Sequence, residues 1–232
     1  MTSSQATIRP AYALEETQAA LIRSVFAWMT LGLTVTGFVA SVVIHMPALS
    51  FLYQGPILFV LLFLELGLVF WLSARVMQMS PSTGSMMFLV YSALNGVTLA
   101  PIAFVYTGES IASAFVVTGG LFGVMSLYGY VTKRSLAGFG GFLLMGLVGL
   151  ILASIVNIFI MSNALSFACS VVGVLIFTGL TAYHVQRIKQ SGAQVQSGSD
   201  EFRRLAILGA LSLYLDFINL FLYLLRFFGR RD

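Results

Sequence analysis

Long apolar stretches separated by short polar connections dominate the pattern of this chain. Seven of these stretches approach or exceed the ~20 residues that a helix needs to cross the ~30 Å hydrocarbon core of a bilayer. We therefore predict an all-α fold, a polytopic bundle of seven transmembrane helices. The predicted spans are Ser24–His45, Ile57–Val76, Ser85–Tyr106, Ser110–Val131, Gly141–Met161, Ser166–His184 and Leu205–Phe228.

The composition agrees with a chain whose main partner is the lipid bilayer. Hydrophobic residues make up 59% of the sequence and charged residues only 9%. The net charge of +4 comes from basic residues that flank the spans and do not cluster on a soluble domain, so no nucleic-acid partner is expected. Cys169 is the one cysteine and lies inside the sixth span, which excludes an internal disulfide.

The distribution of basic residues predicts the orientation of the chain. By the positive-inside rule, the connections that hold them are cytoplasmic. The N-terminal segment 1–23 is then cytoplasmic as well, and it precedes the transmembrane domain 24–229 and the tail 230–232. The basic residues of the internal connections are Arg75, Lys133, Arg134, Arg187, Lys189, Arg203 and Arg204.

The basic residues at the C-terminus conflict with this orientation. Seven crossings would place the tail outside, although Arg226, Arg230 and Arg231 lie there. Either the preceding spans override these charges, or Leu205–Phe228 is buried centrally or re-entrant and does not cross fully. We expect a full crossing.

Polar side chains are grouped on one face of the last predicted span, Leu205–Phe228. At helical spacing this face carries Ser212, Asp216, Asn219 and Tyr223, while aliphatic residues fill the other side. A carboxylate at the centre of a membrane helix costs roughly 2.5–3.5 kcal/mol on insertion scales, so Asp216 is expected to face protein, water or an ion. Asp216 is therefore the first candidate for a functional residue, and the other three are its supporting polar groups.

Four segments resemble the Bax inhibitor-1 family of membrane proteins, in its bacterial branch. They occur in the order, and in the predicted spans, that the family has. The resemblance extends from about Ala20 to Gly229. The segments are ELGLVFWLSAR at 65–75, YSALNGVTLAP at 91–101, MSLYGYVTKR at 125–134 and LSLYLDFINLFLYLLR at 211–226.

The resemblance implies a seven-helix fold with a central last helix, located in a bacterial inner membrane. It also implies a calcium-permeable leak that is sensitive to pH and uses a pair of aspartates. The aspartate of the last helix corresponds to Asp216. The other closes a Thr-Ala-Tyr-Asp motif in the family, whereas this chain reads Thr-Ala-Tyr-His and places His184 there.

A pair formed by His184 and Asp216 would respond to pH. Histidine ordinarily changes charge between about pH 5 and 8, so protonation would turn a neutral–anionic contact into an ion pair. Our hypothesis is a gate between the sixth and seventh helices that acid strengthens, with Asp216 as a possible transient calcium contact. Alternatively, His184 is a helix-end histidine bonded to carbonyls or water. Contact between His184 and Asp216 requires the seventh helix to begin below the membrane, or the sixth helix to continue past Arg187.

Two charged residues of the second span are further candidates for the ion pathway. Glu65 could be a station on the outer half of the pathway or a buried structural partner. Arg75 lies too far along the helix to pair with Glu65. It could reach Asp216 or the His184 region, or it could anchor the span at the interface by snorkelling. Tyr91, Asn95 and Thr98 share a face of the third span, where we expect Asn95 to bond between helices.

We expect no enzyme activity and no cofactor, apart from calcium as a possible transported ion. Neither histidine belongs to a His-Glu-x-x-His segment, and no glycine-rich phosphate loop is present. The function predicted from the sequence is a pH-sensitive calcium leak pathway. The alternative is a regulator that transports nothing and restrains another membrane protein, such as a membrane-anchored protease.

Overall fold

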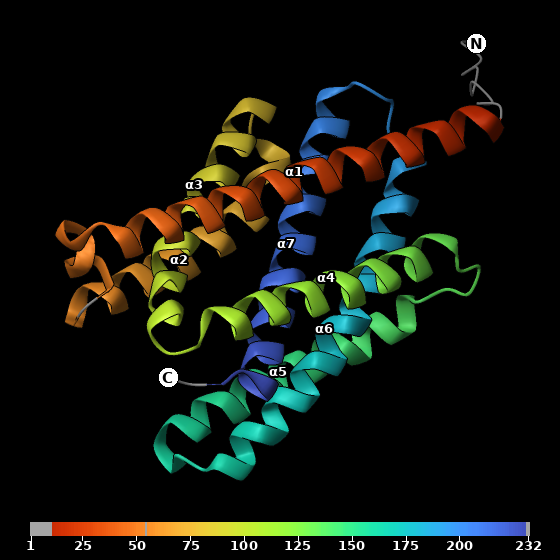
Figure 1. Cartoon of the computed structure of the whole chain (residues 1–232). Helices are drawn as coiled ribbons and strands as arrows, with labels where there is room; N and C mark the ends of the chain where they lie inside the picture. Colours follow the sequence, from red (N-terminus) through yellow and green to blue (C-terminus); the bar gives the residue numbers. More distant parts are fainter. Residues whose placement is uncertain (1–10, 54, 231–232) are drawn as a thin grey trace, which may run out of the picture.

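The computed structural model describes residues 11–53 and 55–230. The first ten residues of the predicted N-terminal segment, and positions 231 and 232 of the tail, lie outside this part of the chain. Within it, seven long helices form a bundle (Figure 1). They are α1 (Ala11–His45), α2 (Gly55–Arg75), α3 (Pro81–Leu99), α4 (Gly108–Val131), α5 (Ala137–Ile160), α6 (Asn163–Gly192) and α7 (Asp200–Phe228). Short 3₁₀ segments extend the connections at η1 (Pro47–Tyr53), η2 (Val76–Gln78) and η3 (Ala100–Phe104).

Each predicted span is confirmed as a helix long and apolar enough to cross a membrane. The helix ends differ most at α1, which begins at Ala11 rather than near Ser24, and at α6, which continues past His184 to Gly192. At 1.5 Å per residue, the 35 residues of α1 span about 52 Å, well beyond the ~30 Å of hydrocarbon. Polar residues thus continue these helices into the aqueous phase. Hydropathy does not indicate the helix ends there, because the sequence is no longer apolar.

Side-chain caps set the start of four helices. In each case a Ser or Thr hydroxyl accepts a hydrogen bond from the backbone N–H three residues later, which satisfies one of the free donors of the first turn. An Ala at such a position costs about 1 kcal/mol. The caps are Ser80 for α3, Thr107 for α4, Ser162 for α6 and Ser199 for α7.

α7 is the central helix of the bundle, as the resemblance implied. It packs against α1, α3, α4 and α6 (Figure 1), and a larger share of it is buried than of any other described span. By contrast, α2 and α5 lie at the periphery and expose most of their apolar side chains. The polar face of α7 therefore meets protein rather than lipid.

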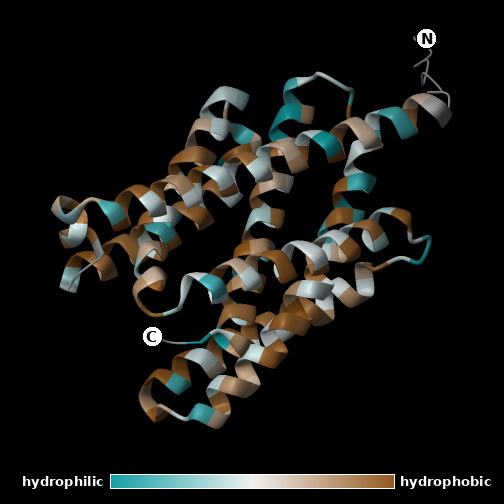
Figure 2. Cartoon of the chain, in the orientation of Figure 1, coloured by the Kyte–Doolittle hydropathy of each residue, from teal (hydrophilic) through white to brown (hydrophobic). Residues whose placement is uncertain are grey.

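One end of the bundle carries most of the charged side chains. Figure 2 shows hydrophilic residues at the start of α1, at the α4–α5 connection and at the α6–α7 connection, while apolar residues cover the body of the helices. We call this the basic end, because Lys133, Arg134, Arg187, Lys189 and Arg203 lie there. The opposite end holds the α3–α4 and α5–α6 connections.

The C-terminal residues show that α7 runs the full length of the bundle. Arg230 O accepts a hydrogen bond from Thr107 N at 3.2 Å, and Arg230 N donates to Ser110 Oγ at 2.9 Å. These contacts fix the chain beyond α7 to the start of α4, at the end opposite to the basic end. α7 is therefore one continuous helix and not a re-entrant segment, whereas its full crossing of the bilayer stays a prediction.

The connection between α6 and α7 is shorter and better packed than the sequence suggests. The Ser, Gly and Gln content of Gln190–Asp200 predicts a flexible connection, but α6 continues to Gly192. Gly192 lies against Gln18 of α1, and Val195 is buried. The N-terminal extension of α1 thus covers this connection, which explains why a polar sequence is ordered there.

Candidate functional site

His184 and Asp216 form a pair between α6 and α7. His184 Nδ1 lies 2.6 Å from Asp216 Oδ2, which is a hydrogen-bond distance. This hydrogen bond becomes an ion pair when the imidazole is protonated. Contact required one of the two helices to extend beyond its predicted span, and both do, since α6 continues past Arg187 and α7 begins at Asp200. The predicted contact is confirmed, and the alternative of a helix-end histidine bonded only to carbonyls or water is wrong.

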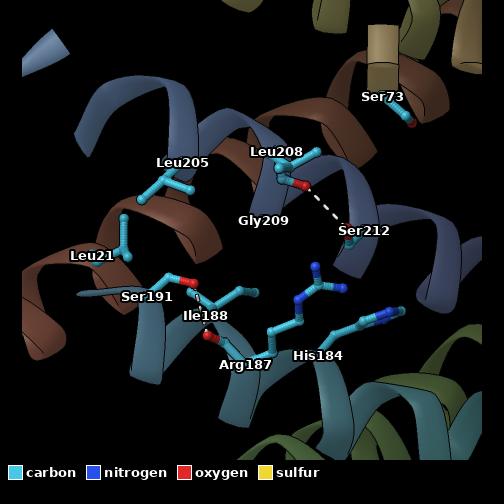
Figure 3. A pocket seen from close by; sticks show the side chains of 10 residues that line it. All are labelled: Leu21, Ser73, His184, Arg187, Ile188, Ser191, Leu205, Leu208, Gly209 and Ser212. Atoms are coloured by element: carbon cyan, nitrogen blue, oxygen red, sulfur yellow. Dashed lines mark hydrogen bonds between the residues drawn. The ribbon is translucent and has the colours of Figure 1, made fainter. Parts of the chain in front are cut away.

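The two partners differ in their access to water. Only 3% of the Asp216 side chain is exposed, compared with 19% for His184. His184 lines a cavity of about 300 Å³ that opens at the basic end (Figure 3). Ser212, one turn before Asp216 on α7, lines the same cavity and donates to the carbonyl of Leu208 at 3.0 Å. The pair therefore meets the cavity at the basic end through His184.

Arg187 is a residue of this cavity that the sequence analysis assigned only to membrane topology. Figure 3 shows its guanidinium pointing across the cavity towards the α7 side, next to the ring of His184. Arg187 follows His184 by three residues on α6, and such neighbours share one face of a helix. The spacing of three residues from His184 could therefore have identified Arg187 as a neighbour of the site. A positive charge at the cavity mouth opposes the entry of cations from this end.

A second cavity, of about 350 Å³, lies on the other side of Asp216 along α7. Asn219 and Tyr223 line it, and Arg226 lies at the end nearer the C-terminus. Asn219 donates to the carbonyl of Leu215 at 2.8 Å. From Ser212 to Asn219 the rise along the helix is about 10 Å. This short stretch separates the two cavities, and the His184–Asp216 pair is within it.

Tyr223 closes the second cavity against α6. Its ring stacks on Phe177, with 5.9 Å between the ring centroids, and it covers Gly173. A Cβ atom at position 173 would lie 2.6 Å from the Tyr223 ring, so only glycine allows this approach. The predicted polar face of α7 thus has distinct parts: Ser212 in one cavity, Asp216 in the pair, and Asn219 with Tyr223 in the other cavity.

Glu65 is held by the face of α3 that the sequence analysis identified. Both Asn95 Nδ2 and Thr98 Oγ1 donate hydrogen bonds to its carboxylate, the latter at 2.7 Å. The expected interhelical bond of Asn95 is thereby confirmed. The residues that line the two cavities on α7 do not include Glu65. These contacts fit a structural partner between α2 and α3, and the role in an ion pathway stays a prediction.

The structure does not place Arg75 at the site. Its guanidinium donates to Gln78 Oε1 at 2.9 Å on the surface, beside Trp71 and Met79. The alternative in which Arg75 reaches Asp216 or the His184 region is therefore wrong. The reason is the position of α2, which packs on α3 at the edge of the bundle and leaves its last turn directed outwards. Arg75 fits the interfacial anchor that was the alternative.

A buried hydrogen-bond network around Tyr214 was missed by the sequence analysis. Tyr214 Oη donates to Thr36 Oγ1 at 2.7 Å, and the Thr36 hydroxyl donates to the carbonyl of Ser92 at 2.8 Å. The network joins α1, α3 and α7 at a point where Tyr214 is fully buried. Nothing in the spacing of these residues indicates it, because each is a single polar group in an apolar run.

Comparison with known proteins identifies the family. The family model described as Inhibitor of apoptosis-promoting Bax1 matches residues 18–232. The chain is 50% identical over 210 residues to Inner membrane protein YbhL of Escherichia coli strain K12, which covers 89% of this chain and 90% of that protein. It is 43% identical over 209 residues to a protein of Rickettsia prowazekii, with 89% and 88% covered. A membrane protein of Streptococcus pyogenes serotype M1 is 42% identical over 173 residues, with 73% and 72% covered. The chain therefore belongs to the Bax inhibitor-1 family of integral membrane proteins.

Proposed function

We propose that this protein forms a pH-sensitive leak pathway for cations, calcium in particular, in a bacterial inner membrane. The N-terminus and the basic end lie in the cytoplasm, in agreement with the positive-inside rule. The observation that carries the proposal is the partly buried His184–Asp216 pair, which lies between the cavity at the basic end and the cavity on the other side of Asp216.

The charge of the pair supports a gate that closes in acid. With a neutral imidazole the pair carries a net charge of −1, which favours a cation beside Asp216. Protonation of His184 makes the pair neutral and joins α6 to α7 by an ion pair. Cation binding and helix separation both become less favourable, so flux falls as the pH falls.

The inventory of ligands supports a transient contact with calcium. Calcium takes six to eight oxygen ligands when it is held firmly. Among the described residues, no group of three or more His, Cys, Asp or Glu side chains is arranged to hold a metal. Asp216 is one carboxylate, and its neighbours on α7 are a hydroxyl and an amide. One carboxylate with a hydroxyl and an amide offers fewer ligands than firm binding needs, which suits a calcium ion that passes through.

The experiment is calcium influx into proteoliposomes that contain purified protein. Wild type, Asp216→Asn and His184→Asp are compared over a range of pH, with empty liposomes as the baseline. We expect Asp216→Asn to abolish or deregulate the flux. His184→Asp should shift its pH dependence, because a pair of carboxylates that share one proton titrates differently from an imidazole beside a carboxylate.

The same experiment separates the leak from the alternative of a regulator. If wild type shows no flux above empty liposomes at any pH, the leak proposal is overturned. Asp216 would then be a structural acid, and the protein would act by binding and restraining another membrane protein, such as a membrane-anchored protease. Purification with crosslinking would be the next step in that case.

A further inference from the structure

A further cavity of the bundle lies between α4 and α5 at the basic end, and none of its lining residues belongs to the two cavities beside the His184–Asp216 pair. Each of these helices packs along α6, but they make little contact with each other. The space between them is a cavity of about 660 Å³, within the range of about 300–1,000 Å³ that is usual for ligand sites. Gly179 and Ala182 of α6, both buried, contribute the small residues of its lining.

The walls of this α4–α5 cleft face lipid. Tyr128 of α4 and Phe139 and Phe142 of α5 line it, and each exposes 45–64% of its surface. All three lie within membrane-spanning helices, so in the bilayer their exposed surface contacts lipid. A ligand that enters from this direction needs an apolar part.

The rim of the cleft has positive charge that the protein does not neutralise. Arg134 lines the cleft and is exposed, and Lys133 precedes it. Among the described residues, no ion pair involves either side chain. Lys189, nearby on α6, is different: its Nζ donates to the carbonyl of Tyr130 at 2.9 Å and lies over the Tyr130 ring. Lys189 therefore stabilises the end of α4, whereas the guanidinium of Arg134 is available.

A buried glutamine holds the rim in place. Gln186 Nε2 donates to the carbonyl of Arg134 at 2.9 Å, and Gln186 Oε1 accepts from Leu136 N at 2.8 Å. Both bonds come from one buried side chain of α6 and fix the connection between α4 and α5 on either side of Ser135. Arg134 therefore lies at the edge of an apolar cleft, on a loop whose backbone is held by two hydrogen bonds to Gln186.

We propose that the cleft between α4 and α5 binds an anionic phospholipid, with its phosphate at Arg134 and an acyl chain along Tyr128, Phe139 and Phe142. An arginine fork matches phosphate oxygens, and basic pockets between membrane helices are known to hold lipid headgroups. A free phosphate would use only the rim and leave the apolar walls uncovered. The lipid uses both, and this binding is independent of any leak.

The test measures lipid retained by the full-length protein in detergent, using native mass spectrometry. The probes are phosphatidylglycerol and, as a zwitterionic comparison, phosphatidylcholine of the same chain length. The variants are Arg134→Gln and Ser135→Glu, which remove or oppose the charge at the rim. Arg203→Gln is the matched control, because Arg203 is an exposed arginine of the same end that does not line the cleft. Size-exclusion chromatography checks the fold of each.

We expect wild type and Arg203→Gln to retain phosphatidylglycerol in preference to phosphatidylcholine. Arg134→Gln should weaken retention by about fivefold, the effect of one basic residue near an anionic lipid surface, and Ser135→Glu should weaken it further. Equal losses in Arg134→Gln and Arg203→Gln would overturn the proposal, because they would indicate unspecific charge attraction. It would equally be overturned by inorganic phosphate that displaces the lipid completely, or by no preference between the two lipids.

Discussion

Replacing His184 with glutamine tests the part of the gate that depends on a proton. Glutamine keeps an N–H donor within reach of Asp216 but cannot gain a charge. We expect the calcium flux of wild type to fall as the pH is lowered from about 8 to about 5.5, the range in which histidine changes charge. The flux of His184→Gln should stay nearly constant over the same range.

The distance between the two side chains sets the size of this effect. His184 Nδ1 lies 2.6 Å from Asp216 Oδ2. A calcium ion on that carboxylate is therefore on the order of 5 Å from the imidazolium, where a divalent and a unit charge repel by about 6 kcal/mol at an effective dielectric constant of ~20. Because 19% of the His184 side chain is exposed, we discount this for solvent screening. About half of it, ~3 kcal/mol, corresponds to about a hundredfold loss of calcium occupancy.

The assay is calcium entry into proteoliposomes, followed with a trapped fluorescent indicator that is calibrated at each pH. His45→Gln is the matched control, since His45 is the other histidine of the sequence. It is exposed near the opposite end of the bundle, and its Nδ1 lies 2.8 Å from the carbonyl oxygen of Ser41 on its own helix. Acid inhibition that persists unchanged in His184→Gln, or that disappears in His45→Gln, would refute the reasoning.

Three further substitutions test other contacts. Arg75→Gln should leave the flux and its pH dependence unchanged in the same assay, because Arg75 bonds at the surface, and a loss of flux would return it to the pathway. Asn95→Leu removes one donor from Glu65 and should lower stability by roughly 1–3 kcal/mol, measured by thermal denaturation in detergent; an unchanged midpoint would contradict this. Gly129→Ala places a Cβ atom 2.3 Å from a backbone oxygen of α6 and should cost about 1–3 kcal/mol in the same measurement. Gly123→Ala, with no atom within 4 Å of its Cβ position, should be tolerated, and equal effects would contradict the packing argument.

The spans were predictable because hydropathy reports the same property that a bilayer selects. In hydrocarbon every backbone group must be satisfied within the helix, so an apolar run of sufficient length is a helix. The helix ends were less predictable. α6 passes from apolar sequence into the polar residues up to Gly192, and tertiary contact with Gln18 of α1, rather than composition, accounts for its order there.

Pairing between helices was predictable only where a motif or a rare residue indicated it. Asp216 was identified because a carboxylate is costly in a membrane span, and His184 because it replaces an aspartate of a recognised motif. The outward direction of Arg75 depends on how α2 is rotated and placed, which its own sequence does not determine. The hydrogen bond between Thr36 and Tyr214 was equally unpredictable from local sequence, because it arises from the packing of α1 against α7.

The histidine changes the force that can open the gate. Two carboxylates at this place would repel each other once both are ionised, and that repulsion would separate the helices. The pair of His184 and Asp216 carries a net charge of −1 in its deprotonated state, and the imidazole can still donate its Nδ1 proton to the carboxylate across the observed 2.6 Å. Loss of the proton therefore weakens the contact without making it repulsive. Opening then depends on a cation that competes with the imidazole for Asp216, so the flux should depend on cation concentration as well as on pH.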